Sequence, residues 1–467
     1  MGGIMEQTRP VLIVGAGPTG LTAALELTRF GIPVRLVDQY NAPSATSRAL
    51  AVHARTVELM HQRGIAATMV ELGNRAFAAA VYDGHMLLGR IDLHAIESRF
   101  NYVLLLSQSE TERLLRERLL QAGLLVERAT QLVAFTQLSG AAHGVHATLR
   151  HADGRLEEVD AAYLIDAEGA HSTARHQLDL PFAGKTLPNT YLIADLHLDG
   201  AVAQDALTIF VPAEGLLAAF PMGNRRFRVL ATERAAAAPA TPPPGLDTIA
   251  AAWARSSPVP VVLRDLQWSA YFRINSRALH RLRHGSVFFA GDAAHIHSPA
   301  GGQGMNTGIQ DAINLGWKMA WVYRGLAPDA LLDTYDEERL PVIHQLVTGT
   351  ERVTDIITSD TAFVHTLLRH MLPAVLHIDA VRRRGAAAIS ELAVHYRASS
   401  LNGASEGHGT LHAGDRVPDV AVSEEYSTRV LDLLDPSRFT VLAAGEPLRL
   451  EAYGDLCTQC RVAAGGG

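Results

Sequence analysis

The chain has very little cysteine, which excludes a fold held together by a disulfide framework. Only Cys457 and Cys460 occur among its 467 residues, a usage typical of proteins from a reducing compartment. No apolar signal segment opens the chain, and its first apolar run, residues 11–14, is far too short to cross a bilayer. We therefore expect a cytoplasmic protein with no membrane partner.

An excess of positive charge is also missing. The formal net charge is −7, which argues against nucleic acid as a partner because such proteins carry a basic patch. No metal site is predicted, since His295 and His297 lie two residues apart without a third candidate ligand nearby, and we interpret them as fixing a loop. The length and a hydrophobic content of 48% indicate a globular enzyme of two or three domains.

A glycine-rich turn follows the first apolar run. Residues 11–14 predict a buried strand, Gly15-Ala-Gly-Pro-Thr-Gly20 a turn, and residues 19–30 a helix. In such a unit the glycines allow a tight turn, close approach to a pyrophosphate and packing of helix on strand, while the helix N-terminus attracts phosphate. Asp38 lies eighteen residues after Gly20, and its carboxylate can accept hydrogen bonds from ribose hydroxyls. A negative charge there disfavours the 2′-phosphate of NADP, so FAD or NAD fits better. The predicted cofactor contacts here are Gly15, Gly17, Pro18, Thr19, Gly20, Asp38 and Gln39.

The longest motif covers residues 290–318. Residues 287–290 predict a buried strand that ends at Gly291, so Asp292 lies where ligands bind in open α/β sheets. The run 299–304 can bring backbone close to a flat ring, and a helix starting near Met305 adds a positive N-terminus. The predicted cofactor contacts here are Gly291, Asp292, Pro299, Gly302, Gly304, Met305 and Asn306.

Together the two motifs resemble those of the class A flavoprotein monooxygenases, the FAD-dependent aromatic hydroxylases related to p-hydroxybenzoate hydroxylase and to polyketide hydroxylases. The resemblance covers about residues 8–395. It implies that NADPH or NADH reduces FAD and that O2 then forms a C4a-hydroperoxyflavin, which hydroxylates a phenolic or polycyclic polyketide-like aromatic substrate. The loop containing Pro299, Gly301 and Gly302 would surround that oxygen intermediate.

Three shorter segments carry further matches to this family. Arg48, in Ser47-Arg-Ala49, corresponds to an arginine near the flavin that is implicated in NAD(P)H use, so we expect a catalytic and cofactor-binding role. Gln108 corresponds to a glutamine that touches FAD. In the third segment, Glu168 and Gly169 stand where the family has an Asp-Gly pair. Glutamate keeps the charge of the aspartate but adds a methylene, so the position of its carboxylate must shift, which affects NAD(P)H use more than FAD binding.

The predicted fold class is α/β, with a Rossmann-like three-layer FAD-binding domain, an inserted antiparallel-sheet substrate domain and a helical C-terminal part. The FAD domain is expected over 1–75, 104–180 and 276–345, and the substrate domain over 76–103 and 181–275, where apolar residues alternate in period two. Residues 346–400 are expected to be helical. Residues 401–467 resemble the start of a thioredoxin-like domain, with an incidental cysteine pair. The candidate substrate contacts are Phe220, Pro221, Arg228, Tyr271 and Arg273.

Three alternative functions stay open on this fold. A flavin halogenase is disfavoured, because its Trp-x-Trp motif is absent: no two tryptophans lie two residues apart. A flavin-dependent epoxidase or Baeyer–Villiger-type oxygenase would share every motif above. A non-catalytic flavin-binding protein is supported only by Glu168. The expected oligomeric state is a monomer or a homodimer.

Overall fold

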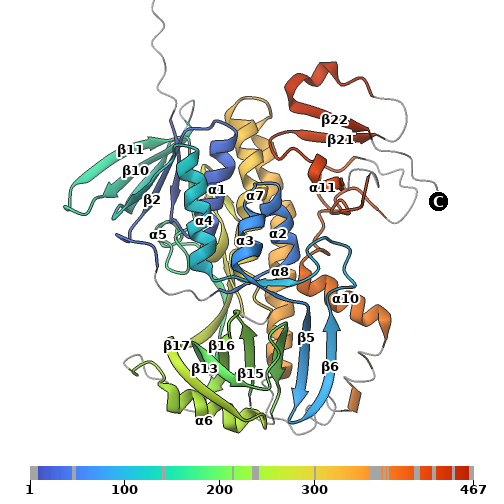
Figure 1. Cartoon of the computed structure of the whole chain (residues 1–467). Helices are drawn as coiled ribbons and strands as arrows, with labels where there is room; N and C mark the ends of the chain where they lie inside the picture. The colour runs from blue at the N-terminus through green and yellow to red at the C-terminus, as the bar shows by residue number, and fades with distance from the viewer. Residues whose placement is uncertain are drawn as a thin grey trace, which may run out of the picture.

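The computed structural model describes residues 9–44, 49–138, 140, 143–212, 215–233, 241–298, 301–357, 370–371, 375, 378–403, 411–422, 428–443 and 448–461. The structure has two bodies (Figure 1). The upper body contains a six-stranded sheet and its helices, and the lower body contains an eight-stranded sheet with one helix beneath it. No helix within these ranges is long and apolar enough to cross a bilayer.

The upper body is built on a six-stranded sheet in the order β18-β19-β12-β1-β2-β8. Its central strand β1 is buried at every residue and pairs in parallel with β2 and β12, as expected for a strand covered on both faces. The strands are β1 (Val11–Val14), β2 (Val34–Asp38), β8 (Val126–Arg128), β12 (Tyr163–Asp166), β18 (Arg283–His284) and β19 (Val287–Phe289).

Helices and a second small sheet cover the two faces of this central sheet (Figure 1). One face carries the helices α1 (Pro18–Arg29), α4 (Gln108–Gln121) and α7 (Gly304–Tyr323). The other carries an antiparallel sheet of β9 (Gln131–Leu138), β10 (Gly144–Arg150) and β11 (Leu156–Ala161). The three-layer architecture predicted from the sequence is therefore confirmed.

The lower body is an eight-stranded sheet in the order β20-β17-β13-β16-β15-β14-β5-β6. Its pairs are antiparallel except that β14 and β5 run in parallel. The strands are β5 (Ala78–Asp83), β6 (Met86–Asp92), β13 (Ala183–Gly200), β14 (Ala206–Phe210), β15 (Leu217–Pro221), β16 (Arg226–Glu233), β17 (Val261–Ala278) and β20 (His295–Ile296). The helix α6 (Leu246–Ser256) packs against one face through Ile249, Ala252 and Trp253.

The two bodies share strands across the predicted domain boundary. The strand β17 of the lower sheet continues to Ala278. The short strand β20 lies in the loop after β19 of the upper sheet and pairs with the end of β17. A short sheet of β3 (Ala51–Val52), β7 (Val103–Leu105) and β4 (Asn74–Ala76) also lies where the chain passes between the bodies. The loop that follows β19 is thus bonded directly to the lower sheet.

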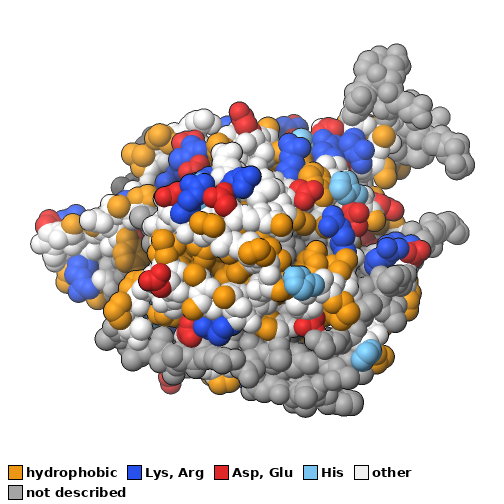
Figure 2. Space-filling view, turned by 60° about the horizontal axis from the view of Figure 1, so that its bottom comes forward, with side chains coloured by type: hydrophobic (Ala, Val, Ile, Leu, Met, Phe, Trp, Pro, Cys, Tyr) orange, Lys and Arg blue, Asp and Glu red, His pale blue; other side chains and the backbone are white. Residues whose placement is uncertain are grey.

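The remaining helices of the described residues lie around the upper body, beside the lower sheet and in the tail (Figure 1). They are α2 (Ala54–His61), α3 (Ala66–Leu72), α5 (Thr173–Gln177), α8 (Thr334–Ile357), α10 (Asp379–Ser390) and α11 (Val430–Leu433). Space-filling Figure 2 shows acidic and basic side chains interspersed on the exposed face around a band of hydrophobic side chains, without a broad patch of one sign.

The tail forms a parallel pair of strands, β21 (Phe439–Ala443) and β22 (Cys457–Arg461). Phe439 packs on Trp317 and Trp321 of α7, with ring centroids 5.8 and 5.0 Å apart, which confirms a packing role for these tryptophans. Cys457 and Cys460 are free thiols on one strand. Three residues of extended strand separate their Cα atoms by roughly 10 Å, well beyond the span of a disulfide.

Candidate active site

Two of the three glycines in the first turn are required by the packing of the chain itself. Gly15 has φ of +100°, and a Cβ there would lie 2.2 Å from the carbonyl oxygen of Ala167. A Cβ at Gly20 would lie 1.8 Å from the carbonyl oxygen of Gly15. A Cβ at Gly17 would meet nothing within 4 Å. The open space is at the N-terminus of α1, where no side chain caps the helix, and it therefore fits a pyrophosphate held by backbone N–H groups.

Asp38 is held against this turn at the end of β2. Its Oδ2 accepts from the backbone N–H of Ala16 at 2.7 Å, and its Oδ1 accepts from that of Tyr40 at 2.9 Å. Arg128 approaches the same carboxylate at 3.4 Å. An ionised carboxylate can accept about four hydrogen bonds, so Asp38 retains acceptor capacity for a ribose. Gln39 follows it as an exposed residue.

The second motif packs directly on the first through one threonine. A Cβ at Gly291, which has φ of +60°, would lie 2.5 Å from Thr19 Oγ1, and a Cβ at Gly308 would lie 2.3 Å from it. Thr19 is in the first turn of α1, whose next residue is the tightly packed Gly20. The two glycine-rich motifs, far apart in sequence, therefore form one continuous backbone surface that ends at the exposed Asp292.

A buried ion network fixes the loop after β19. Asp311 Oδ2 accepts from His295 Nε2 at 2.7 Å and from the N–H of Gly291 at 3.1 Å, and its Oδ1 accepts from Arg339 Nε at 2.7 Å. Burial opposes ionisation of Asp311, but Arg339 and His295 lower its pKa to about 2. The loop-fixing role expected for His295 is thus confirmed, while Asp311 and Arg339 were not among the predicted site residues.

Asn306 joins the glycine loop to the segment after β2. Its Oδ1 accepts from the N–H of His53 at 2.9 Å, and its Nδ2 donates to the carbonyl oxygens of Ala51 and Gly302 at 2.9 and 3.0 Å. Gly301 and Gly302 have φ of +92° and +68°, so the loop depends on glycine there. Gly304 and the buried Met305 begin α7. Pro299 and Arg48 lie outside the described residues.

The buried imidazole of His53 and the half-buried imidazole of His297 lie beside this loop. Among the described residues, neither ring nitrogen of His53 has a hydrogen-bond partner, and Nε2 of His297 has none either. The ring of His53 neighbours the backbone of Gly301 and Gly302, and that of His297 lies 3.5 Å from a Cβ built at Gly304. Burial lowers the pKa of each histidine to about 4. Orphaned polar atoms beside a glycine loop fit a polar planar group bound there, and His53 was not among the predicted contacts.

Comparison with known proteins identifies the family. A family model described as an FAD binding domain matches residues 8–350. The chain is 38% identical over 416 residues to 6-methylpretetramide 4-monooxygenase of Streptomyces rimosus, covering 87% of this chain and 73% of that protein. It is 33% identical to pentachlorophenol 4-monooxygenase of Sphingobium chlorophenolicum, covering 93% and 79%. The solved structure of CabE, an aromatic hydroxylase from angucycline biosynthesis, superposes with a TM-score of 0.80 at 30% identity, covering 98% of this chain and 90% of that one.

The chain is a class A FAD-dependent aromatic hydroxylase. FAD is its cofactor, with NAD(P)H and O2 as co-substrates, and the enzyme is a monooxygenase, which sets aside the non-catalytic alternative. Its residues fit the cofactor: the space at Gly17 and the acceptor Asp38 belong to the first motif, and the imidazole nitrogens without a partner among the described residues lie beside the glycine loop of the second.

Gln108 of the hydroxylase lies at the start of α4 and holds the segment that follows residues 45–48. Its Oε1 accepts from the N–H of Ala49 at 3.4 Å, and its Nε2 donates to Glu112 at 2.8 Å. The N-cap Ser107 accepts from the N–H of Glu110 at 3.3 Å. This places Gln108 beside Ala49, and its contact with FAD stays a prediction.

Glu168 of the hydroxylase caps the short helix α5. Its carboxylate accepts from the N–H and Oγ1 of Thr173 at 2.8 and 2.9 Å, while burial raises its pKa. Gly169 follows with φ of +87°. Arg175 is also tied into the chain, donating to the carbonyl oxygen of Ala293 at 2.9 Å. The extra methylene of Glu168 is thus accommodated by capping, and its part in binding FAD or NAD(P)H stays a prediction.

The five predicted substrate contacts of the hydroxylase divide between the two faces of the lower sheet. Tyr271 packs with the α6 cluster, and by alternation along the strands Pro221 and the exposed Arg273 share that face. Phe220 packs on the opposite face with Tyr191, Leu230, Ile274 and Phe272, and Arg228 lies on that face by the same alternation.

Arg228 is sequestered on this face. It donates from Nε and Nη2 to the two carboxylate oxygens of Asp195 at 2.7 and 2.8 Å, and Trp268 Nε1 donates to the same carboxylate at 2.8 Å. The side chain is buried, so Arg228 shapes the wall through this ion pair. Phe272, next to the predicted Tyr271, packs in the same cluster as Phe220 and was not among the predicted residues.

Proposed function

We propose that the hydroxylase acts on a phenolic or polycyclic aromatic substrate bound between the Gly301–Gly302 loop and the α6-free face of the eight-stranded sheet. The observation that carries this proposal is the aromatic and aliphatic cluster on that face. It comprises Tyr191, Phe220, Leu230, Phe272 and Ile274. Because α6 packs against the other face, this cluster lies on the face that α6 leaves uncovered; Figure 1 shows α6 at the outer, lower side of the sheet.

A substrate held there would be positioned mainly by apolar contact. Rings of Tyr191 and Phe272 stack with centroids 5.6 Å apart, and they and Phe220 present flat surfaces of the kind that bind aromatic ligands. The ion pair of Arg228 with Asp195 lies on the same face and is already satisfied within the chain. Arg228 therefore supplies shape and a fixed charge pair, and a substrate carboxylate is not required.

The cofactor loop is bonded to this sheet, so the two halves of the site keep a fixed distance. Arg277 and Ala278 of β17 pair with Ile296 and His295 of β20, and His295 is held in turn by Asp311. FAD, when bound, supplies the redox and oxygen-transfer chemistry. The residues of the chain hold the loop in place and exclude water from the substrate, which limits wasteful release of peroxide.

Several assignments toward the cofactor belong to this proposal. Backbone N–H groups near Gly17 would hold the pyrophosphate and Asp38 a ribose, since both retain donors or acceptors that the chain does not use. Arg48 and Pro299 keep the roles implied by the family. The names of the relatives favour a multi-ring or substituted phenolic substrate: 6-methylpretetramide for one and pentachlorophenol for another.

The test is reduction of the purified, FAD-loaded enzyme by NADPH and by NADH under anaerobic conditions, with phenols and polycyclic aromatics added one at a time. We expect one compound class to accelerate flavin bleaching. Isotopically labelled O2 should then appear in a ring hydroxyl of the product. Label found in an epoxide or a lactone would favour the alternative oxygenase chemistries instead. No acceleration by any aromatic compound would contradict the proposed substrate class.

A further inference from the structure

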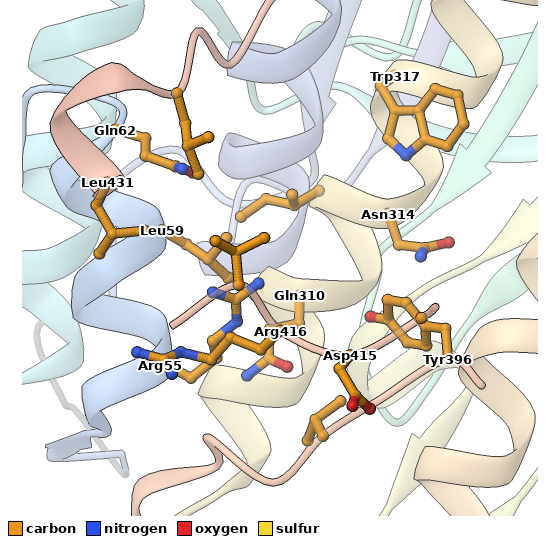
Figure 3. A pocket seen from close by; sticks show the side chains of 15 residues that line it. Arg55, Leu59, Gln62, Gln310, Asn314, Trp317, Tyr396, Asp415, Arg416 and Leu431 are labelled. Carbon is orange, nitrogen blue, oxygen red and sulfur yellow. The ribbon is translucent and has the colours of Figure 1, made fainter. Parts of the chain in front are cut away.

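A separate cavity of about 270 Å³ lies between α2, α7 and the tail. Figure 3 shows side chains from these three elements converging on it. None of the predicted FAD contacts lines it. Its wall includes Arg55 and Leu59 of α2, Gln310 and Trp317 of α7, and Arg416 and Leu434 of the tail.

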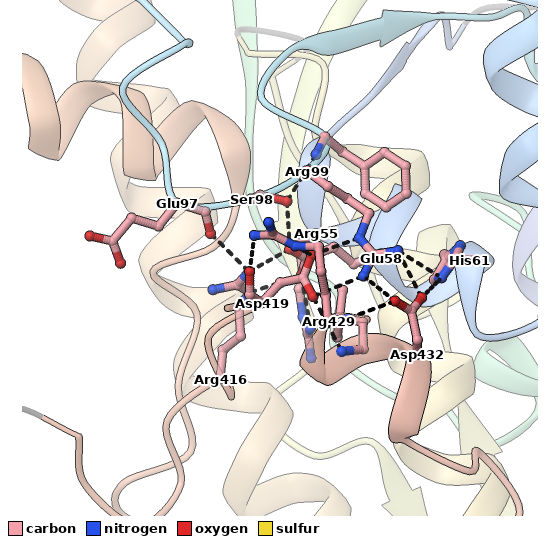
Figure 4. A network of polar contacts seen from close by, with 12 residues as sticks. Arg55, Glu58, His61, Glu97, Ser98, Arg99, Arg416, Asp419, Arg429 and Asp432 are labelled. Carbon is pink, nitrogen blue, oxygen red and sulfur yellow. Dashed lines mark hydrogen bonds and ion pairs between the residues drawn. The ribbon is translucent and has the colours of Figure 1, made fainter. Parts of the chain in front are cut away.

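An ion network beside the cavity carries more positive than negative charge. Within the described part of the chain, it contains four guanidinium groups and three carboxylates (Figure 4). His61 also contacts one of these carboxylates, with its Nε2 2.9 Å from Asp432 Oδ1. The guanidinium groups are Arg55, Arg99, Arg416 and Arg429, and the carboxylates are Glu58, Asp419 and Asp432.

Arg55 is the arginine with the weakest pairing in this network. Arg416 binds both carboxylate oxygens of Glu58, and Arg99 binds both Asp419 and Asp432. Arg55 makes one hydrogen bond, from Nη1 to Glu58 at 3.2 Å. That carboxylate also accepts from Ser98, so its acceptor capacity is shared by several donors.

Arg55 also lines the cavity. A guanidinium carries five N–H donors, and 26% of the Arg55 side chain is accessible although burial lowers its pKa. Asp415 also reaches the wall, but its two carboxylate oxygens accept from Arg397 at 2.5 and 2.9 Å. The net positive charge beside the cavity is therefore presented by Arg55, and it favours an anion.

The rest of the wall favours an apolar body behind that anion. Leu59, Ile313, Leu431 and Leu434 line it together with the indole of Trp317. The cavity, at about 270 Å³, lies at the lower end of the range of roughly 300–1,000 Å³ for small-molecule pockets. A compound with one ring therefore suits this space better than a larger polycyclic one.

We propose that this cavity binds a small organic anion, a carboxylate on a single-ring apolar body, with Arg55 as its ion partner. The proposal is independent of the proposed substrate and of the site on the lower sheet. The occupant would lie close to Gln310, one helical turn along α7 from Asn306 of the glycine loop, or ~6 Å at 1.5 Å per residue.

The test is calorimetric titration of the FAD-loaded enzyme with benzoate and, at equal ionic strength, with inorganic phosphate. We expect benzoate to bind and phosphate to bind about tenfold or more weakly, because only benzoate buries apolar surface. Arg55→Gln should weaken benzoate binding about tenfold or more through loss of a charge-assisted hydrogen bond. Leu434→Phe, which fills the cavity without changing charge, should weaken it as strongly.

Arg264→Gln is the matched control, since Arg264 is an exposed, paired arginine on β17, and it should leave benzoate binding unchanged. Unaltered binding in both Arg55→Gln and Leu434→Phe would place benzoate elsewhere, including at the substrate face, and would overturn the proposal. Equal affinities for phosphate and benzoate would contradict the claim that the cavity holds an apolar ring. Absence of benzoate binding to the wild-type enzyme would contradict the whole proposal.

Discussion

The hydroxyl of Thr19 occupies the space that a side chain on Gly308 would need. A Cβ built on Gly308 would lie 2.3 Å from Thr19 Oγ1, far inside contact distance. The same hydroxyl excludes a side chain on Gly291, where a Cβ would lie 2.5 Å away. This contact between the first turn of α1 and the second turn of α7 brings the two halves of the cofactor surface together.

Gly308→Ala should therefore destabilise the protein by forcing α7 away from α1. Overpacking of this kind costs about 1–3 kcal/mol, and thermal unfolding should show a lower Tm. Thr19→Ala in the same chain removes the obstructing hydroxyl, so the double variant should recover part of the loss. Gly349→Ala, at a helical glycine with nothing within 4 Å, is the control. Equal Tm values for Gly308→Ala and wild type would contradict the contact.

Gly17→Ala should separate cofactor binding from stability. Because a Cβ there meets no atom of the chain and the backbone has φ of −77°, the Tm of the FAD-free protein should be unchanged. The affinity for FAD, measured by titration of flavin fluorescence, should fall about tenfold or more since the methyl group occupies the approach of the pyrophosphate. Gly20→Ala is the contrasting variant, because its Cβ would clash with Gly15 and should lower the Tm without FAD.

Asp311→Asn should reduce the loss of stability that acid causes. The pKa of Asp311 is lowered from 3.8 to about 2. Its stabilising contribution of about 2 kcal/mol is present above pH 4 and is lost as pH falls toward 2. Urea unfolding across that range should show a shallower pH dependence in the variant. At neutral pH the variant should be less stable by about 3–5 kcal/mol, because Arg339 loses its buried partner. Asp153→Asn, in an exposed turn, should behave as wild type.

His53→Gln should flatten the dependence of stability on pH between pH 6.5 and about 4. Burial lowers the pKa of His53 from 6.5 to about 4, so the unfolded chain binds a proton that the folded chain excludes. The contribution of neutral His53 to the free energy of unfolding, about 3 kcal/mol, is fully present above pH 6.5 and is lost as pH falls toward 4. Urea unfolding at pH 7 and pH 4.5 measures the difference, and an identical fall in the variant would show that His53 is not buried in its neutral form.

Phe272→Ala and Tyr271→Ala should have opposite effects, because neighbouring residues of a strand point to opposite faces. If the substrate binds as proposed, Phe272→Ala should raise KM about tenfold with little change in Tm. Tyr271→Ala should lower Tm by opening the cluster under α6 while KM stays close to the wild-type value. Steady-state oxidation of NAD(P)H and thermal unfolding measure both effects. A rise in KM for Tyr271→Ala alone would place the substrate on the other face.

The sequence by itself determined those features that depend on neighbouring residues. The pattern of nearby residues predicts the strand, glycine turn and helix of residues 11–30. It also predicts the acidic residue Asp38 and the helix after Gly304. Their geometry arises from φ values and hydrogen bonds within a few residues. The three-layer fold and the FAD chemistry followed in turn, because the motifs of residues 15–20 and 290–318 occur together in one chain.

Only the tertiary structure decided which side chains each face presents. Phe272 and not Tyr271 lies with Phe220, since a shift of one residue reverses the face of a strand. Arg228 is sequestered by Asp195, 33 residues away. Positive charge is in excess at Arg55 because Arg416, which lies 358 residues after Glu58 in the chain, binds the Glu58 carboxylate. Such pairings depend on the approach of distant segments, and local patterns carry no information about them.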